Sequence, residues 1–509
     1  MRWWESRSFL LAVALISAVP LLWPQIPPLV DLPGHIGRYR VELDLHSSAD
    51  LQRFYDFRWA LIGNLGVDLL VVPLAPILGL EPAVKLIIAS IPVLTVLGIF
   101  AVAREVHGRV PPTALFAVPF IYGYPFNYGF VNFALSVGLA LLAFALWLRL
   151  SRPGKLRLRA LLFAPLSCAL WLVHVFGWGF LGLLAFSAEI VRFRDEGLSW
   201  LTAARRSALQ VLPLSIPFAL MVLWRSGEAG GVTGTFFFLG WKLFALVAGL
   251  RDRWLVWDTL GVAVALVLIG AAIFDRRMEF SRRLAIPAVA LLAAFIALPF
   301  VLFGSAHADM RLVPYTLIVA LLAVRERKSN IQIERRLAVL GLAFLACRLV
   351  GNTLSFAIAD SDARNELRAL DHIPRGAAVL TLASGYCAPV WEVPRHWHYG
   401  AFVIARKFGF SNDQWQMPGA QLLTVRYAAA VPFQDVKSAL VYSPHCASVL
   451  NPRKLTDRPR TTQESLNNFP RDAFDYVWLI KPPDGAFVAP ADLTPVWSSG
   501  DSRLYRVEK

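Results

Sequence analysis

Charged side chains are scarce in this chain of 509 residues, since Asp, Glu, Lys and Arg make up only 17% of it. Soluble domains carry about 25%, so the composition excludes an ordinary soluble enzyme and a disordered chain. Cysteine is also rare, with four residues, which excludes a small disulfide-stapled scaffold. Hydrophobic residues make up 57%, and the mean hydropathy is +0.54. Because one crossing needs ~20 apolar residues, we expect an α-helical polytopic membrane protein.

Nucleotide-binding and common hydrolase motifs are missing too. A P-loop, GxGxxG, HExxH, GxSxG or kinase signature does not occur in the context that each requires, so ATP-driven chemistry is not expected. The net charge of +15 would suggest a nucleic-acid partner in a soluble protein. In a membrane protein, however, cytoplasmic loops collect Lys and Arg, and no nucleic-acid partner is needed.

Hydropathy and loop charge together predict a topology. We expect eleven spans, near residues 9–23, 83–103, 112–122, 133–148, 160–173, 178–191, 208–224, 258–274, 285–303, 311–324 and 337–357. The basic loops 149–159, 192–206, 275–283 and 325–336 would be cytoplasmic, and the loops 123–132 and 304–310, without Lys or Arg, would be outside. This count places the N-terminus in the cytoplasm and the C-terminus outside.

The number of spans depends on how two segments near the N-terminus are interpreted. The first apolar run lacks a small-x-small cleavage site, so we interpret it as an uncleaved span rather than a signal peptide. The apolar stretch 65–80 contains Asp68, Pro73 and Pro76, which suits a lipid-facing span poorly. We therefore expect an interfacial segment there.

The region after the last span changes composition and is long enough for a core of its own. Residues 363–372 are typical of a short helix, and residues 377–382, 476–480 and 504–507 are typical of strands. We thus expect a transmembrane domain at 1–357, with a first outer loop at 27–82, and a small extracytoplasmic α/β domain at 358–509. Cys387 and Cys446 in that domain are either a disulfide or two buried thiols, because sequence spacing does not show proximity.

The first outer loop contains a candidate catalytic group. Pro33 suits the first turn of a helix, and a helix from there would place His35, Arg38 and Glu42 on one face. Asp31 precedes it, near the positive end of the helix dipole. Asp31 is either a helix-start carboxylate on an amphipathic surface helix or a catalytic carboxylate above the membrane, with His35 and Arg38 beside it.

Two further outer loops contain candidate binding residues. The uncharged loop 123–132 is rich in aromatic residues and includes Asn127 and Tyr128, which suit either an interfacial aromatic belt or a sugar or lipid site. In the loop 304–310, His307 and Asp309 precede Arg311 at the outer end of a span. A charge there is costly unless it is paired, so Arg311 either pairs with Asp309 or binds phosphate.

Other polar residues carry weaker signals. The segment 225–257 has several basic residues, among them Arg225, on a side where basic residues are not expected, which suggests an anionic ligand. His396 and His398 would share one face of a strand, but without a third and fourth ligand they do not predict a metal site. Nothing in the sequence requires a cofactor, and the need for a divalent ion is left open.

The order of these features resembles the GT-C superfamily of integral-membrane glycosyltransferases. A first span leads into a long outer loop with an early acidic residue, followed by an apolar interfacial segment and a span that ends in the sequence AREVHGR at residues 103–109. Bacterial members have a similar ARRLFGR pattern. The resemblance is to the lipid A aminoarabinose transferase and protein O-mannosyltransferase branches, and its motifs lie in roughly the first 130 residues.

The resemblance implies a polyprenyl-phosphate-linked sugar as donor and a glycolipid, polysaccharide or protein as acceptor, at the outer face of a bacterial inner membrane. It implies that Asp31 is the general base, with His35 beside it, and that Arg311, Arg38 and Arg225 bind the donor phosphate. Asn127, Tyr128, His307 and Asp309 would then contact the substrates. Many members have paired acidic residues, whereas Leu32 and Pro33 follow Asp31 here.

The alternative from another functional class is a transporter or flippase of an anionic lipid or glycan. Such a protein places ionisable residues at mid-membrane depth. Here most span interiors lack them, with Arg348 in the last span as the exception. The outer-surface position of the charges favours the transferase.

Overall fold

A computed structural model describes residues 2–223, 233–302, 304–387, 390–417, 419–448, 460–483 and 487–509. The chain divides into two compact units. The first unit comprises Met1–Trp23, Leu61–Leu70 and Lys85–Phe356, and the second comprises Pro24–Ala60, Val71–Val84 and Ala357–Lys509. The early outer loop thus folds with the C-terminal region, although most of the chain separates the two in sequence.

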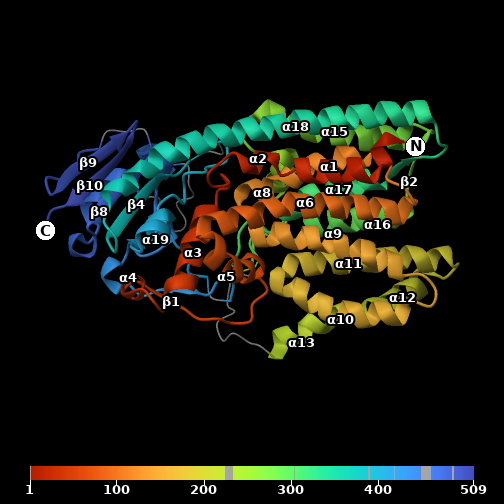
Figure 1. The fold of residues 1–509 in the computed structure, drawn as a ribbon, viewed down its shortest axis with the longest axis horizontal. Helices are drawn as coiled ribbons and strands as arrows, with labels where there is room; N and C mark the ends of the chain where they lie inside the picture. The colour runs from red at the N-terminus through yellow and green to blue at the C-terminus, as the bar shows by residue number, and fades with distance from the viewer. Residues whose placement is uncertain are drawn as a thin grey trace. The chain divides into compact units, whose positions relative to one another are not determined.

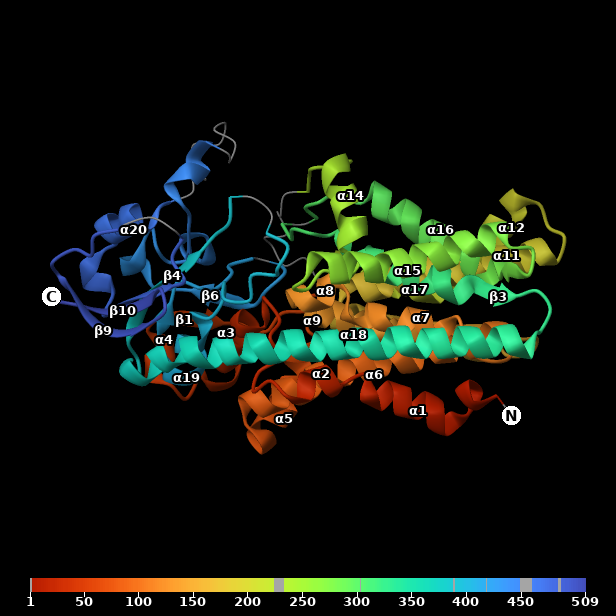
Figure 2. The same ribbon diagram turned by 90° about the horizontal axis from the view of Figure 1, so that it is seen from above.

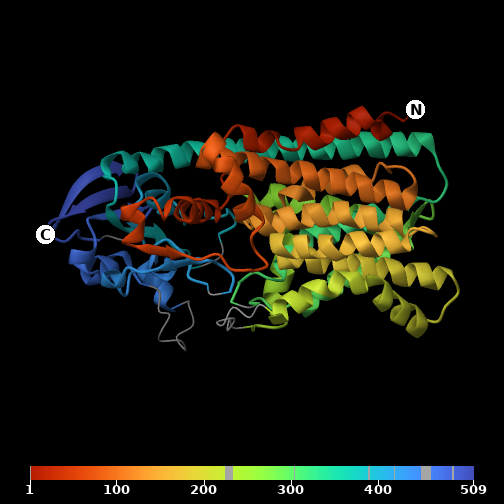
Figure 3. The same cartoon turned by 60° about the horizontal axis from the view of Figure 1, so that its bottom comes forward.

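The first unit is a bundle of helices (Figures 1 and 3). Its helices are α1 (Arg7–Ile16), α2 (Val19–Leu22), most of α6 (Leu80–His107), α7 (Ala114–Ala117), η2 (Val118–Tyr122), α8 (Tyr124–Tyr128), α9 (Val131–Leu150), α10 (Leu156–Val173), α11 (Val175–Asp195), α12 (Trp200–Val211), η3 (Leu212–Ser215), α13 (Ile216–Leu223), α14 (Leu239–Val247), η4 (Ala248–Leu250), α15 (Leu255–Phe274), α16 (Arg282–Ala297), η5 (Met310–Leu312), α17 (Val313–Ala323) and most of α18 (Ile331–Glu366). The strands β2 (Met278–Phe280) and β3 (Val324–Glu326) pair at one end. Helix α9 is apolar on all sides because neighbours such as α10 and α11 bury most of its residues. Elsewhere in the bundle, α15 lies beside α17 (Figure 2).

Among the residues that the structure describes, six helices are long and apolar enough to cross a membrane. They are α6, α9, α10, α11, α15 and α18. The chain is therefore a multi-pass membrane protein, but the predicted count of eleven spans is not confirmed. Residues 112–122 form the short elements α7 and η2, with Pro119 in the first turn of η2. The described part of 208–224 is likewise interrupted, at η3, where Pro213 begins a new turn.

The second unit is built around a mixed sheet, as the sequence predicted for its C-terminal part. The sheet order is β5 (Phe410–Ser411), β4 (Ala378–Ser384), β8 (Tyr476–Ile480), β10 (Ser502–Val507) and β9 (Leu493–Ser499), with β7 (Leu440–Val441) also paired to β4. Strand β4 pairs in parallel with β5, β7 and β8, whereas β10 is antiparallel to β8 and β9. All seven residues of β4 are buried, as expected of a central parallel strand.

The second unit also contains α3 (Leu32–Asp44), α4 (Ala49–Gln52), part of α5 (Gly66–Leu78), η6 (Leu367–His372), α19 (Ala401–Lys407), η7 (Ala428–Ala430), η8 (Val436–Ser438), η9 (Pro444–Ser448), α20 (Thr462–Asn468) and η11 (Arg471–Ala473). Strands β1 (Tyr55–Phe57) and β6 (Leu423–Val425) pair antiparallel, which ties the early loop to the C-terminal region. The Cys387–Cys446 disulfide is formed, with the two Cα atoms 5.1 Å apart. It resolves the alternative of two buried thiols.

Candidate functional site

Asp31 lies at the start of α3, where the sequence predicted a helix. Its side chain makes no capping hydrogen bond to the helix. Instead, its Oδ1 atom lies 3.6 Å from Nε2 of His398, and 14% of the side chain is exposed. Helix α3 is not a surface helix, because most of its residues up to Val41 are buried. Asp31 is thus a carboxylate at the start of a helix, as one alternative had it, but the helix is buried rather than exposed at the surface.

His398 connects Asp31 to a second carboxylate. Its Nδ1 atom lies 2.6 Å from Oδ1 of Asp413, whose side chain is fully buried. Burial by itself lowers the pKa of His398, but the charge and hydrogen bond of Asp413, with a further contribution from Asp31, outweigh that effect and raise it above the ordinary value. Asp31, His398 and Asp413 thus form a carboxylate–imidazole–carboxylate row within the second unit.

Two glycines of α3 allow the close approach that builds this row. A Cβ atom on Gly34 would lie 2.4 Å from two ring carbons of Trp415, and one on Gly37 would lie 2.8 Å from Nε2 of Gln414. The Gln414 side chain also donates to the carbonyl of Gly34 at 3.0 Å. The spacing of the two glycines therefore brings the segment after β5, which contains Asp413, against the start of α3.

The other candidates of the early loop lie close by in the same unit. The ring of His35 lies 5.5 Å from that of Trp415, and the ring of His398 lies 4.5 Å from it. Arg38 is fully buried, and its Nη2 atom is 3.5 Å from Nδ1 of His35. His35 thus lies beside Arg38, and it shares the Trp415 ring with His398, which lies next to Asp31.

Arg311 belongs to the first unit, in the turn η5 that leads into α17. It is buried, donates to the hydroxyl of Ser305 at 2.8 Å and lies over the ring of Phe130 at 4.1 Å. It also donates to the carbonyl of Ala306 and lies near the rings of Phe133 and Phe176. A guanidinium in such surroundings suits an anionic oxygen.

His307 lies among three aromatic rings, those of Tyr128, Trp241 and Phe300, at 5.2, 5.0 and 4.8 Å. Burial, together with the charges of Arg311 and Arg251, lowers the pKa of His307 to about 3. His307 is therefore neutral at physiological pH and suits hydrogen bonding rather than proton donation. The positive charges of Arg311 and Arg251 therefore both act at the position of His307.

Asp309 has partners that differ from both sequence interpretations. Its Oδ2 atom accepts a hydrogen bond from Nζ of Lys242 at 2.9 Å, and its Oδ1 atom accepts from Nε1 of Trp241 at 3.1 Å. Asp309 is fully buried and Lys242 nearly so. The expected pairing of Arg311 with Asp309 is replaced by this buried ion pair, which ties α14 to η5, so Asp309 has a structural environment.

The aromatic loop lies at the same end of the first unit. Asn127 is buried and donates to the carbonyls of Tyr122 and Arg251 at 3.0 and 3.1 Å, so it fixes the segment that leads into α15. The guanidinium of Arg251 donates to the hydroxyl of Tyr124 and lies over that ring. Arg251 is a basic group that the sequence suggested only as part of the segment 225–257.

The remaining candidate residues of the sequence analysis are not part of the arrangements described above. Arg225 lies outside the described residues. Nε2 of His396 is 3.0 Å from the hydroxyl of Ser384, so His396 and His398 have different partners. Within the described part of the chain, no group of three or more His, Cys, Asp or Glu side chains is arranged to hold a metal ion.

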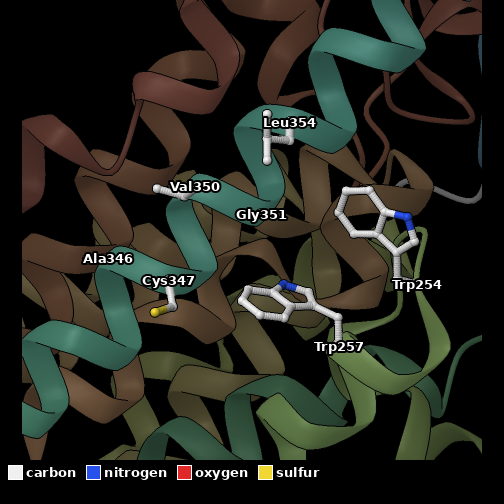
Figure 4. Close-up of a pocket in the computed structure, with 7 residues that line it drawn as sticks. All are labelled: Trp254, Trp257, Ala346, Cys347, Val350, Gly351 and Leu354. Atoms are coloured by element: carbon white, nitrogen blue, oxygen red, sulfur yellow. The ribbon is translucent and has the colours of Figure 1, made fainter.

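The first unit also has an apolar groove of about 520 Å³ between α15 and α18 (Figure 4). It is lined by Trp254, Trp257, Ala346, Cys347, Val350, Gly351 and Leu354. Arg348 of α18 and Asp258 of α15, from the same two helices, pair at 3.2 Å, and both are buried.

Sequence reasoning missed Asp413 and assigned no role to His398 beyond a weak metal signal. One signal for Asp413 exists in the polar run Ser411–Gln414, whose four residues are all fully buried. Buried polar runs are unusual, but burial itself is not visible in the sequence.

Comparison with known proteins adds one result. A scan against protein-family models finds no match, and a search of curated proteins finds none. The crystal structure of ArnT from Cupriavidus metallidurans bound to undecaprenyl phosphate is similar over 98% of this chain and 97% of its own, with a TM-score of 0.50 and 12% sequence identity. The chain therefore shares its fold with ArnT, a lipid A aminoarabinose transferase of the GT-C family that the sequence resembles.

Proposed function

We propose that this protein is a glycosyltransferase that moves a sugar from a polyprenyl-phosphate-linked donor to a glycolipid, polysaccharide or protein acceptor at the outer face of the cytoplasmic membrane. The observation that carries the proposal is the similarity in fold, over nearly the whole chain, to ArnT bound to undecaprenyl phosphate. The buried carboxylate row at Asp31 supports it, because acceptor activation needs a positioned base.

The reaction assigns Asp31 the role of general base. An acceptor hydroxyl gives its proton to the Asp31 carboxylate while its oxygen forms a bond to the anomeric carbon of the sugar. The bond between that carbon and the donor phosphate oxygen breaks, and the electron pair leaves with polyprenyl phosphate. One bond forms and one breaks at the anomeric carbon, and the acceptor proton passes to Asp31. The step therefore needs no oxidant and no nucleotide.

Arg311 and Arg251 are the proposed phosphate-binding groups of the first unit. Their charges both act on His307, so an anionic headgroup there would meet two guanidinium groups beside a neutral imidazole. Arg311 already contacts the Ser305 hydroxyl and an aromatic face, and a phosphate oxygen is a stronger acceptor than a hydroxyl. Arg38 beside His35 is the corresponding candidate of the second unit.

The donor's polyprenyl chain is proposed to lie in the groove between α15 and α18. The groove lining is apolar apart from the Cys347 thiol and the indole N–H groups, and both helices are membrane-spanning candidates. An isoprenoid chain gains favourable burial against such a surface. Tyr128 and Asn127 are the proposed contacts to the sugar.

The experiment is envelope analysis by mass spectrometry after deletion and complementation. Deletion is expected to remove one glycan or glycolipid species, and the wild-type gene is expected to restore it. Asp31→Asn should not restore it. Asp44→Asn should, because Asp44 lies at the other end of α3, is 31% exposed and pairs with Arg40, one helical turn away. An unchanged envelope after deletion would contradict the proposal.

A further inference from the structure

Asp31 lies beside His398, which is hydrogen-bonded to a second carboxylate, that of Asp413. The role of His398 in the second unit can be inferred from this arrangement. Nδ1 of His398 lies 2.6 Å from Oδ1 of Asp413, and Nε2 lies 3.6 Å from Oδ1 of Asp31. The two ring nitrogens therefore point to two different carboxylates. The contact with Asp413 is a hydrogen bond and the contact with Asp31 is an ion-pair distance, so both are favourable when both ring nitrogens of His398 bear protons.

Asp413 is fixed independently of Asp31. Its second carboxylate oxygen accepts from the backbone N–H of Ala401 at 3.2 Å, and its own N–H donates to the hydroxyl of Ser411 at 3.3 Å. The side chain is fully buried, and its pairing with His398 fixes the imidazole plane. Trp415, with its ring 4.5 Å from that of His398, packs against the same imidazole.

We propose that His398, anchored by Asp413, is a positioning residue that presents its Nε2–H to Asp31 and holds the Asp31 carboxylate ionised and aimed at the acceptor. This inference rests on the proposed function, in which Asp31 is the base. His398 keeps both ring protons during the transfer, and the acceptor proton goes to Asp31. His398 thus acts through Asp31 rather than on the substrate.

The charge of His398 gives the arrangement a pH dependence with a definite sign. Its pKa is raised above the ordinary value for histidine, so the imidazolium is present below that pKa and lost as the pH rises through it. Activity is therefore expected to fall on the alkaline side. The charged or titratable groups described around this row are Asp31, His35 and Arg38 from α3, Asp413 from the segment after β5, and His396, whose own pKa is affected by the charges of Lys481 and His398.

The first test measures kcat, KM and their pH dependence for the full-length protein in lipid nanodiscs. His398→Gln is expected to lower kcat on the order of tenfold to a hundredfold, because a misaimed base costs about that much, with the KM for the donor unchanged. The alkaline loss of activity should also disappear. His396→Gln is the matched control, because its pKa of about 4 makes it neutral across this range, and it should leave both unchanged.

The second test does not depend on activity. Hydrogen–deuterium exchange at the imidazole C2 position, followed by mass spectrometry, measures the pKa of each histidine. In the wild-type protein His398 should titrate above the ordinary value for histidine, and Asp31→Asn should lower the pKa of His398.

The outcomes separate the two proposals. A wild-type protein that transfers no sugar while Asp31→Asn still lowers the pKa of His398 would contradict the proposed function and keep the Asp31–His398 coupling. An active protein in which His398→Gln keeps the wild-type kcat and pH profile would overturn the positioning role. An unchanged pKa of His398 in the Asp31→Asn variant would overturn the positioning role as well.

Discussion

The buried pair of Lys242 and Asp309 gives a prediction that separates a structural from a substrate-binding role. Nζ of Lys242 contacts Oδ2 of Asp309 at 2.9 Å and the carbonyls of Phe295 and Leu298 at 2.8 and 2.9 Å. Asp309→Asn removes the negative charge and leaves the ammonium group buried among neutral acceptors. Breaking a buried ion pair costs about 3–5 kcal/mol, which corresponds to a decrease in Tm of roughly 5–10 °C.

The assay is thermal unfolding of the purified protein in detergent, run as a double-mutant cycle. Lys242→Met should cost a similar amount, and the double variant should cost clearly less than the sum of the two single changes. Asp195→Asn is the matched control, since Asp195 pairs with Arg282 at the surface, where both side chains are about half exposed, and such a pair contributes about 0–1 kcal/mol. An unchanged Tm in Asp309→Asn, together with lost donor binding, would refute this reasoning and restore the substrate role that the sequence suggested.

Three further predictions concern packing, the groove and topology. Gly34→Ala should destabilise the protein by about 1–3 kcal/mol and lower the transfer rate, because the new methyl group displaces the ring of Trp415; unfolding and kinetics measure this. Polyprenyl phosphate should slow maleimide labelling of Cys347, which lines the groove. Single cysteines at exposed Lys155 and Asp501 should react with an impermeant reagent from opposite sides of the membrane, with Asp501 outside.

Each of these has its own control and contradicting result. Gly182→Ala places its methyl group in open space on α11 and should be neutral, so an equal loss of stability in both variants would contradict the packing argument. Cys168, the other free cysteine, should keep its labelling rate, and protection of both thiols or of neither would contradict the groove assignment. Labelling of both introduced cysteines from one side would contradict the topology.

Hydropathy and strand patterns predicted the coarse architecture because those signals are local. The strands at 377–382, 476–480 and 504–507 correspond to β4, β8 and β10, and the helix after Pro33 is α3. The predicted span 112–122 is not confirmed, since hydropathy counts apolar residues and does not register that the segment forms the short elements α7 and η2. Length and polarity therefore give the class of fold but not the number of crossings.

The candidate site was predictable only where its residues are neighbours in the chain. Asp31, His35 and Arg38 are related by helical spacing, and the sequence grouped them. The partners of this group come from far along the chain: Gln414 reaches Gly34 across 380 residues, and Asp413 comes with it. The Lys242–Asp309 pair was missed for the same reason, because Lys242 lies 67 residues from Asp309 and nearby Arg311 was the more obvious cation.

The most direct test of the central claim is release of polyprenyl phosphate by the purified protein in lipid nanodiscs. The protein is supplied with a polyprenyl-phosphate-linked sugar and a membrane extract as the source of acceptor. Wild-type protein is expected to release polyprenyl phosphate as sugar enters the acceptor fraction, and Asp31→Asn should reduce that rate about 10²–10⁴-fold while still binding the donor. Transfer by Asp31→Asn at the wild-type rate would contradict the account.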